Sequence, residues 1–171
     1  EAIVAACVAE GAQVVAIGRE EAKLEAACAA AGDGAHAEAG DVTDRARIKE
    51  VIDAAIARFG RIDVLINNAG VNIADRSLEK LSPEDWDLVM NINATGAYNT
   101  IHEVLPHMRR QRNGLVIAVS SMAGTAPSVL GGVVYSAAKH AMSVLTQMVD
   151  LEEAKHGIRS SVISPGEINT P

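Results

Sequence analysis

The chain has 171 residues, 49% of them apolar and 22% charged, which suffices for one domain with a hydrophobic core; we expect a single domain over residues 1–171. Its formal net charge of −7 argues against nucleic-acid binding, and its one basic cluster, Arg109-Arg110-Gln111-Arg112, ends a predicted helix, where cations are favoured. No apolar run reaches the roughly 18 residues of a membrane span, and Cys7 and Cys28 lack metal-ligand spacing, so we expect free thiols in a cytoplasmic protein that binds neither membranes nor metal.

Apolar runs of strand length alternate along the chain with longer helical patterns. A helical pattern opens at residue 1 and ends at Gly11. Strands are predicted over 13–19, 35–44 (weak, ending in a turn), 62–70, 114–121 and 158–166, and helices over 20–32, 45–60, 82–111 and 134–157. The strands are apolar throughout rather than alternating, as expected when both faces of a sheet are covered. This order predicts right-handed βαβ units and an α/β fold with a doubly wound parallel sheet.

Polar or glycine-rich groups follow each predicted strand. In open parallel sheets, ligands bind beyond the carboxyl ends of the strands, near the point where the strand order reverses. These ends carry Gly18-Arg19, Asp41-Val42, Asn67-Asn68-Ala69-Gly70, Ser120-Ser121 and Ser164-Pro165-Gly166. Because all of these groups fall on one edge of the sheet, the sequence predicts a ligand site there.

Tyr135 and Lys139 stand four residues apart near the start of the helix predicted over 134–157. At about 100° per residue they share one helical face with Thr146, Asp150 and Glu153, opposite an apolar stripe of Ala137, Ala141, Val144, Met148 and Leu151. The apolar stripe is the face expected to pack. An aromatic residue away from it is oddly placed for stability alone, so two interpretations stand: a packed tyrosine beside a solvated lysine, or an acid–base pair.

The chemistry of a phenol favours the second interpretation. A free phenol ionises near pH 10, too high for acid–base catalysis around neutrality. A lysine ammonium one helical turn away favours the phenolate, and a bound nicotinamide cation would add to this effect. Two partly desolvated charges could stabilise the phenolate enough for catalysis near neutral pH, whereas one exposed lysine could not.

With its neighbours, this pair resembles the classical short-chain dehydrogenase/reductase family. Tyr135-x-x-x-Lys139 is preceded by Ser121 fourteen residues earlier and by Asn67-Asn68-Ala69-Gly70. The segments Ile92-Asn93-Ala94-Thr95-Gly96, "VSSMAG" (119–124) and "SPGEINT" (164–170) follow the family's order and spacing, so the resemblance covers residues 1–171. It implies a Rossmann-like fold and an NAD(P)H-dependent oxidoreductase that interconverts an alcohol and a ketone or aldehyde.

The resemblance also implies a role for each matching position. Tyr135 would be the general acid/base, Lys139 would favour its phenolate and bind the nicotinamide ribose, Ser121 would hydrogen-bond the substrate oxygen, and Asn93 would hold a water behind the lysine. The other cofactor-binding positions would be Asp41, Val42, Asn67, Ala69, Gly70, Pro165, Gly166, Ile168 and Thr170. Taken singly, Ser120 or Ser121 could simply end a strand, Asn93 could bond to backbone inside a helix, and "NNAG" could be a bare turn. The five histidines lack partners at a recognisable spacing and are read as structural.

The residues after the strand 13–19 bear on the choice of cofactor. NAD enzymes usually carry an acidic residue at the end of the second strand, whereas NADP enzymes use a nearby arginine. Here Gly18 leaves room and Arg19 offers a bidentate donor for a 2′-phosphate, which favours NADP(H) over NAD(H). Two points weigh against this choice: Arg19 could be a solvated charge, and Glu20 and Glu21 could oppose a phosphate.

Parts of the family's pattern are missing at both ends. The glycine-rich phosphate loop and the central first strand should precede residue 1, and a substrate segment should follow residue 171. We therefore expect a piece of a longer protein, to which the function belongs. Without the first strand of the order 3-2-1-4-5-6, the strands 13–19 and 35–44 should not join the other three, and the chain should neither fold well nor bind cofactor alone.

Three further expectations concern substrate and partners. Within the same family, the chain could be a 3-oxoacyl-thioester (acyl carrier protein) reductase, with Arg109, Arg110 and Arg112 as the only basic candidates to receive the carrier. In another class, it could be a non-catalytic dinucleotide-binding scaffold. The helices over 84–111 and 134–156 are apolar around much of their circumference, and the family pairs such helices, so a homodimer or homotetramer is expected.

Overall fold

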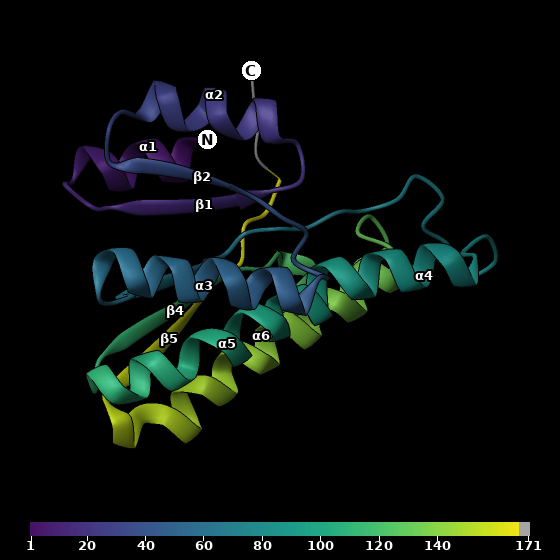
Figure 1. Ribbon diagram of the computed structural model, residues 1–171. Coiled ribbons are helices and arrows are strands. Elements are labelled where there is room, and N and C mark those ends of the chain that lie inside the picture. Colours follow the sequence, from purple (N-terminus) through teal and green to yellow (C-terminus); the bar gives the residue numbers. More distant parts are fainter. Residues whose placement is uncertain (168–171) are drawn as a thin grey trace.

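The computed structural model describes residues 1–167, and its elements follow the predicted alternation (Figure 1). The strands are β1 (Val14–Gly18), β2 (Ala35–Ala39), β3 (Val64–Asn67), β4 (Gly114–Val119) and β5 (Ile158–Ile163). The α-helices are α1 (Ala2–Ala9), α2 (Glu21–Ala31), α3 (Arg45–Phe59), α4 (Pro83–Met90), α5 (Gly96–Gln111) and α6 (Val133–Glu153). A π-helix, η1 (Asn91–Thr95), and two 3₁₀ turns, η2 (Met122–Gly124) and η3 (Ala154–His156), complete the set within these residues.

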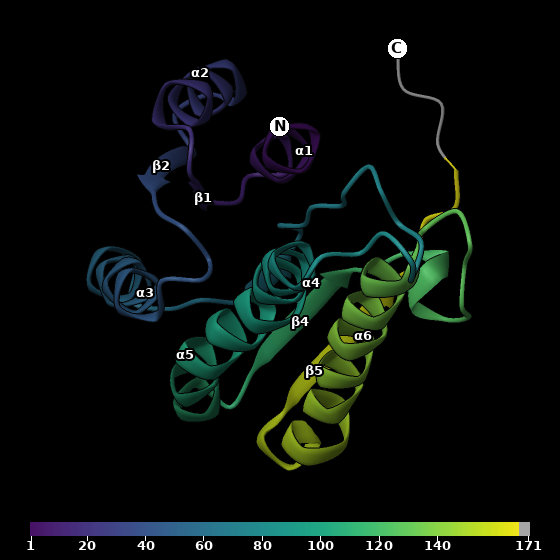
Figure 2. The same cartoon turned by 90° about the vertical axis from the view of Figure 1, so that its right-hand side faces the viewer.

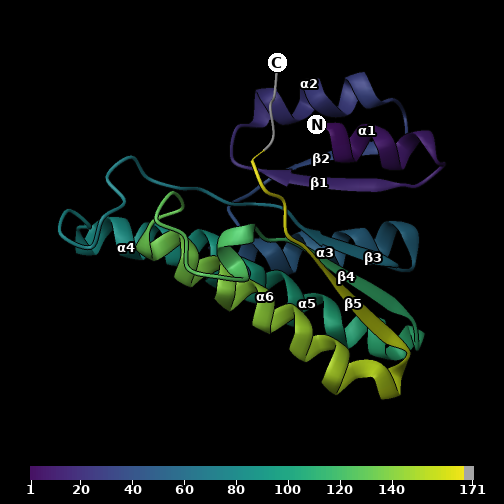
Figure 3. The same ribbon diagram turned by 180° about the vertical axis from the view of Figure 1, so that it is seen from behind.

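The strands form two parallel sheets, which confirms the predicted α/β class. β1 pairs with β2, with Val14 opposite Ala35, and β3, β4 and β5 form a second sheet in that order, with Ile66 opposite Ile117 and Ala118 opposite Val162. As the sequence predicted, the first two strands do not join the other three within the described residues. Helices α1 and α2 lie on one side of β1 and β2, whereas α3, α5 and α6 lie on the opposite side of the strands (Figures 1 and 3).

The main hydrophobic core lies between the helices and the three-stranded sheet. Helix α5 packs against β3 and β4, and α6 packs against β4 and β5. Figure 2 shows α5 and α6 lying along β4 and β5. The core joins one or more buried side chains from five elements: Ile48 and Ile52 (α3), Ile101, Val104 and Met108 (α5), Val116 (β4), Val149 (α6) and Ile158 (β5). Ile17 of β1 packs against the same cluster and links the two-stranded sheet to it.

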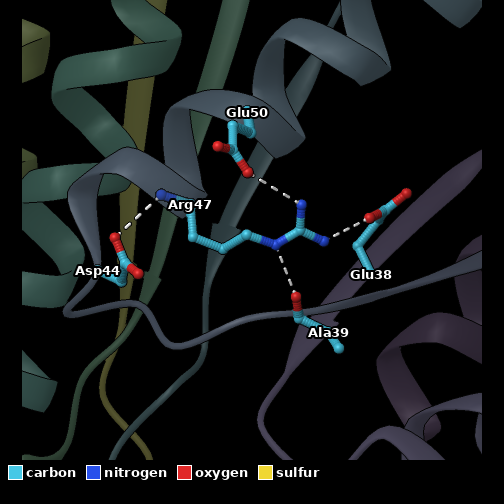
Figure 4. A network of polar contacts seen from close by, with 5 residues as sticks. All are labelled: Glu38, Ala39, Asp44, Arg47 and Glu50. Atoms are coloured by element: carbon cyan, nitrogen blue, oxygen red, sulfur yellow. Dashed lines mark hydrogen bonds and ion pairs between the residues drawn. The ribbon is translucent and has the colours of Figure 1, made fainter.

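An arginine fixes the turn that follows β2 (Figure 4). Arg47 of α3 donates through Nε to the carbonyl oxygen of Ala39 at 2.8 Å and through Nη2 to Glu38 at 2.8 Å, and its Nη1 lies 3.4 Å from Glu50. Asp44 caps α3 by accepting from the Arg47 N–H at 3.0 Å. Both ends of the turn 40–44 are therefore held, which fixes the position of Asp41 and Val42 at the carboxyl end of β2.

The helix predicted over 82–111 is interrupted. It begins as predicted, with the Ser82 hydroxyl accepting from the Asp85 N–H at 3.0 Å and Pro83 in the first turn. Over Asn91–Thr95 it widens into a π-helix, where the Gly96 N–H reaches back five residues to the Asn91 carbonyl. Such π segments are frequent at functional sites, and this one carries the buried Asn93.

The prediction of which face of α6 packs was wrong. Lys139, Thr146 and Glu153 are buried, whereas Val144, Met148 and Leu151 of the apolar stripe are exposed. The polar face can be buried because its groups have partners: Thr146 donates to the Met142 carbonyl at 2.9 Å, and Glu153 forms a bidentate ion pair with Arg109 of α5. Within the described residues, no buried side-chain nitrogen or oxygen lacks a hydrogen-bond partner.

Candidate active site

A cavity of about 250 Å³ lies at the carboxyl ends of β3 and β4. Tyr135 and Lys139 of α6 line it, so the structure brings together the pair that the sequence singled out. The other lining residues come from the strand ends and from the loop after β3: Asn68, Gly70, Val71, Asn72, Val119 and Ser120. The predicted edge of the sheet therefore does carry a concave polar site.

Lys139 is the buried charge of this cavity, with 3% of its surface exposed. Its Nζ donates to the Val119 carbonyl oxygen at 2.8 Å and lies 5.7 Å from the centroid of the Tyr135 ring. Burial lowers the pKa of Lys139 to about 8, so the ammonium form still predominates at pH 7. An ammonium has three N–H donors; the Val119 carbonyl takes one and the Met142 sulfur, at 3.7 Å, takes a second, which leaves one donor.

Asn93 and Gly70 close the back of the cavity around the lysine. The Asn93 amide is fully buried and pairs with the backbone of Val71 on the loop after β3. A Cβ atom on Gly70 would lie 3.2 Å from Asn93 Oδ1 and 3.3 Å from Lys139 Nζ. Glycine at this position therefore leaves the lysine open to the cavity.

The two serines at the end of β4 have different surroundings. Ser120 lines the cavity, is 4% exposed, and bonds through Oγ to Ser143 Oγ at 2.8 Å and to the Lys139 carbonyl oxygen. Ser121 is partly buried and caps η2, its Oγ accepting from the Ala123 N–H at 3.1 Å. Ser121 is thus next to the cavity without lining it, and its role in catalysis stays a prediction.

The predicted adenosine-side residues follow β1, β2 and β3. The Asn67 side chain is buried between β3 and α5, with Oδ1 accepting from Thr100 Oγ1 at 2.6 Å. Asp41 accepts from the Thr43 N–H at 2.9 Å, which holds the pKa of its carboxyl below the usual value. The Val42 carbonyl accepts from the Asn99 amide at 2.9 Å. These contacts hold the turn after β2 and the end of β3 in place.

Arg19 lies exposed just after β1, close enough to Asp41 to contribute to the low pKa of that carboxyl. Glu20, which could have opposed a phosphate, forms an ion pair with Lys23 at 2.7 Å, and this contact lowers the pKa of Glu20. Ala69 is exposed beside Gly70 on the loop after β3.

The segment after β5 approaches the serine turn. The Pro165 carbonyl accepts from the Met122 N–H at 3.0 Å, and Gly166 is exposed beside Met122. Ile168 and Thr170, which the sequence also placed at the cofactor, lie outside the described residues.

The site residues predicted from the sequence did not include five of the lining residues: Asn68 and Ser120, which stand in the quoted strand-end segments, and Val71, Asn72 and Val119. Val119 acts through its backbone carbonyl, for which any residue would serve, so no side-chain signal exists. Val71 and Asn72 follow "NNAG" directly, and their position after a strand end was the available signal.

The residues fit the nicotinamide half of a dinucleotide. Lys139 offers a remaining N–H donor inside a cavity lined in part by polar side chains, and Gly70 provides the space that a side chain would fill. Within residues 1–167, no group of three or more His, Cys, Asp or Glu residues could hold a metal ion. Over the same residues, no helix is long and apolar enough to cross a membrane.

Comparison with known proteins agrees with this geometry. The family model described as short chain dehydrogenase matches residues 1–171, so the chain belongs to the short-chain dehydrogenase family of oxidoreductases, which bind a nicotinamide dinucleotide. It is 41% identical over 131 residues to 3-oxoacyl-[acyl-carrier-protein] reductase FabG of Thermotoga maritima, which covers 77% of this chain and 52% of the relative.

Solved structures give the same result. A short-chain dehydrogenase from Streptomyces avermitilis superposes with a TM-score of 0.90 at 34% identity, covering 99% of this chain and 62% of that one. ElxO with NADP bound superposes with a TM-score of 0.85 at 29% identity, covering 92% of this chain and 64% of that one. The chain therefore spans between about half and two thirds of the length of these three proteins.

Proposed function

We propose that the full-length protein is an NADP(H)-dependent oxidoreductase that interconverts an alcohol and a ketone or aldehyde, with Tyr135 as its general acid/base. The observation that carries the proposal is the convergence of Tyr135, Lys139 and Gly70 on one cavity at the carboxyl ends of the strands, with Asn93 next to Gly70. A structural tyrosine would not need a buried lysine ammonium beside its ring.

When bound, the dinucleotide supplies or accepts the hydride at the substrate carbon. In reduction, the Tyr135 hydroxyl gives its proton to the substrate carbonyl oxygen, and in oxidation the phenolate takes the proton of the alcohol. Lys139 favours the phenolate through its positive charge and offers its remaining N–H donor to the ribose hydroxyls. Ser121 would hydrogen-bond the substrate oxygen after turning its hydroxyl away from the Ala123 N–H.

The preference for NADP(H) over NAD(H) rests on Arg19. Its side chain is exposed beyond the end of β1, and Lys23 pairs with Glu20, one of the acidic side chains that could oppose a phosphate. The similarity to ElxO with NADP bound supports the same choice. Asp41, Val42, Asn67, Ala69, Pro165 and Gly166 would complete the cofactor site.

A second candidate function is reduction of a 3-oxoacyl thioester, because the chain is 41% identical to a FabG protein over 131 residues. The predicted carrier-docking arginines do not favour it. Arg109, Arg110 and Arg112 stand where α5 ends and β4 begins, at the opposite end of β4 from the cavity, and Arg109 is paired with Glu153. If this activity is present, the carrier docks through other residues.

We further propose a cytoplasmic homodimer or homotetramer. Large apolar side chains that are exposed on α4 and α6 support self-association: Trp86, Leu88, Val144, Met148 and Leu151. Light scattering on the full-length protein tests this, and a clean monomer at micromolar concentration would contradict it.

The activity is tested by mixing the full-length protein and NADPH with a panel of ketones, aldehydes and one 3-oxoacyl thioester. Loss of NADPH absorbance with at least one carbonyl, and slower loss with NADH, is the expected result. Binding of NADPH without turnover of any panel member would instead favour the non-catalytic scaffold.

A further inference from the structure

Tyr135 lies in the first turn of α6, which has no side-chain cap. The helix starts at Val133, and its N-cap residue is Gly132. First turns leave backbone N–H groups without partners inside the helix and open more readily than helix interiors. Lys139, one turn further on, is anchored by the Val119 carbonyl. Something other than capping must therefore hold the start of α6.

The Ser136 hydroxyl contacts the backbone of Ser128 at 3.4 and 3.5 Å, and the loop between β3 and α4 (residues 68–82) supplies further and shorter contacts. Arg76 Nη1 donates to the Leu130 carbonyl oxygen at 2.8 Å, and the Arg76 carbonyl accepts from the Val133 N–H at 3.2 Å. Asn72 Nδ2 donates to the Gly131 carbonyl oxygen at 3.1 Å. We call these three contacts the Arg76 clasp; all of them end within five residues before Tyr135.

The guanidinium of Arg76 is itself held in place. Its Nε donates to the Ile73 carbonyl oxygen of its own loop at 2.6 Å while Nη1 reaches across to Leu130. The planar fork thus joins two loops with two charge-assisted hydrogen bonds, and a lysine, with one compact donor group, has no equivalent geometry.

Gly132 permits the close approach on which the clasp depends. Its φ is +83°, and a Cβ atom there would lie 2.4 Å from the Cβ atom and 2.8 Å from the carbonyl oxygen of Arg76. Any other residue would push the two loops apart. The approach of Arg76 to the helix start is thus built into the backbone.

We propose that Arg76 is a positioning residue, which holds the first turn of α6 so that the Tyr135 hydroxyl faces the cavity beside Lys139. The catalytic part of this inference rests on the proposed function. Asn72 links the clasp to the cavity directly, because it lines the cavity and also donates to Gly131. Opening the clasp would free the turn that carries Tyr135 while leaving Lys139 in place.

The first arm of the test measures hydrogen–deuterium exchange in the full-length protein. In Arg76→Met, which keeps the aliphatic stem and removes the donors, amides of residues 133–136 should exchange about tenfold faster, with the rest of α6 unchanged. Gly132→Ala should act in the same way from the other side of the contact. Unchanged exchange in both variants would overturn the proposal that the Arg76 clasp holds the first turn of α6. This arm needs no turnover, so it separates failure of the inference from failure of the proposed function.

The second arm measures kinetics with a substrate of the wild-type enzyme. Arg76→Met should lower kcat about tenfold, leave the NADPH Kd within about twofold, and move the acidic limb of the pH–rate profile for alcohol oxidation up by about half a unit. Arg76→Lys should recover part of the rate. Arg159→Met, at an exposed arginine on β5, is the control and should match the wild type. A fall in kcat with an unmoved pH profile, or a parallel loss of NADPH binding, would assign Arg76 a merely structural role.

Discussion

The Asn93 side chain pairs with the backbone of Val71 through two hydrogen bonds: Oδ1 accepts from the Val71 N–H at 2.8 Å, and Nδ2 donates to the Val71 carbonyl at 2.9 Å. The amide thereby satisfies both backbone groups of one residue, as a neighbouring strand would. It ties the π-helix η1 to the loop after β3, which forms one wall of the cavity.

Replacing Asn93 should therefore loosen the cavity wall. Asn93→Ala leaves both backbone groups of Val71 without their partner, and we expect the free energy of unfolding to fall by about 1–3 kcal/mol. Urea unfolding of the full-length protein measures this. Asn113→Ala, at an exposed asparagine, is the matched control, with an expected change within about 0.5 kcal/mol. Equal effects of the two substitutions would contradict the pairing.

The buried charge of Lys139 should destabilise the folded protein, although the proposed function requires this charge. Lys139→Met removes an ammonium whose pKa burial lowers from 10.5 to about 8, at the cost of leaving the Val119 carbonyl without a donor. Because the first effect is the larger, we expect the variant to be more stable than the wild type by about 1 kcal/mol at pH 7, and inactive. A variant less stable than the wild type at pH 7 would contradict this.

The lowered pKa of Lys139 should also make the stability of the folded protein rise with pH. The folded protein releases the Lys139 proton near pH 8, whereas the unfolded chain releases it at 10.5. Between these values the unfolded state binds more protons, so the stability of the wild type should rise with pH. Lys139→Met lacks this contribution. Urea unfolding of both proteins from pH 7 to 9.5 should show the advantage of the variant shrinking above pH 8; a constant difference would be evidence against the depressed pKa.

Arg19 should decide between the two dinucleotides. A charge-assisted hydrogen bond to a phosphate contributes about 1.5–3 kcal/mol, so Arg19→Ser should weaken NADPH binding at least about tenfold and leave NADH binding unchanged. Fluorescence titration of the full-length protein measures both affinities. Arg61→Ser, before the amino end of β3 and thus away from the carboxyl ends of the strands, serves as the control. If both dinucleotides lose affinity equally, Arg19 does not contact the 2′-phosphate.

Most of the fold could be predicted because the apolar runs, and the capping and turn residues that bound them, are strong local signals. Runs such as Val14–Gly18 and Gly114–Val119 became strands within a residue or two of the prediction, and Ser82 with Pro83 marked a helix start correctly. The separation of β1 and β2 from the other three strands was also predicted.

The failures have a common physical cause: they depend on contacts between distant segments. Periodicity placed Val144 and Leu151 inward, yet both are exposed, because Thr146 bonds to its own helix and Glu153 pairs with Arg109 forty-four residues away. The π-helix at Asn93 likewise has no local marker. Nothing in the sequence around Arg76 indicated that its guanidinium would reach Leu130.

The candidate site was predicted more fully than the packing because its polar groups follow the strands directly. Tyr135, Lys139 and Gly70 do meet at one cavity. Between the two neighbouring serines the sequence favoured Ser121, whereas the side chain that lines the cavity is that of Ser120. A difference of one residue at a strand end is decided by the turn that follows, here η2, and not by the strand pattern.

Tyr135→Phe in the full-length protein shows whether Tyr135 transfers the proton. The variant keeps the ring beside Lys139 and removes only the hydroxyl, so kcat should fall about 1000-fold while the NADPH Kd stays within about twofold of the wild type. Turnover within twofold of the wild type, with NADPH still bound, would contradict it.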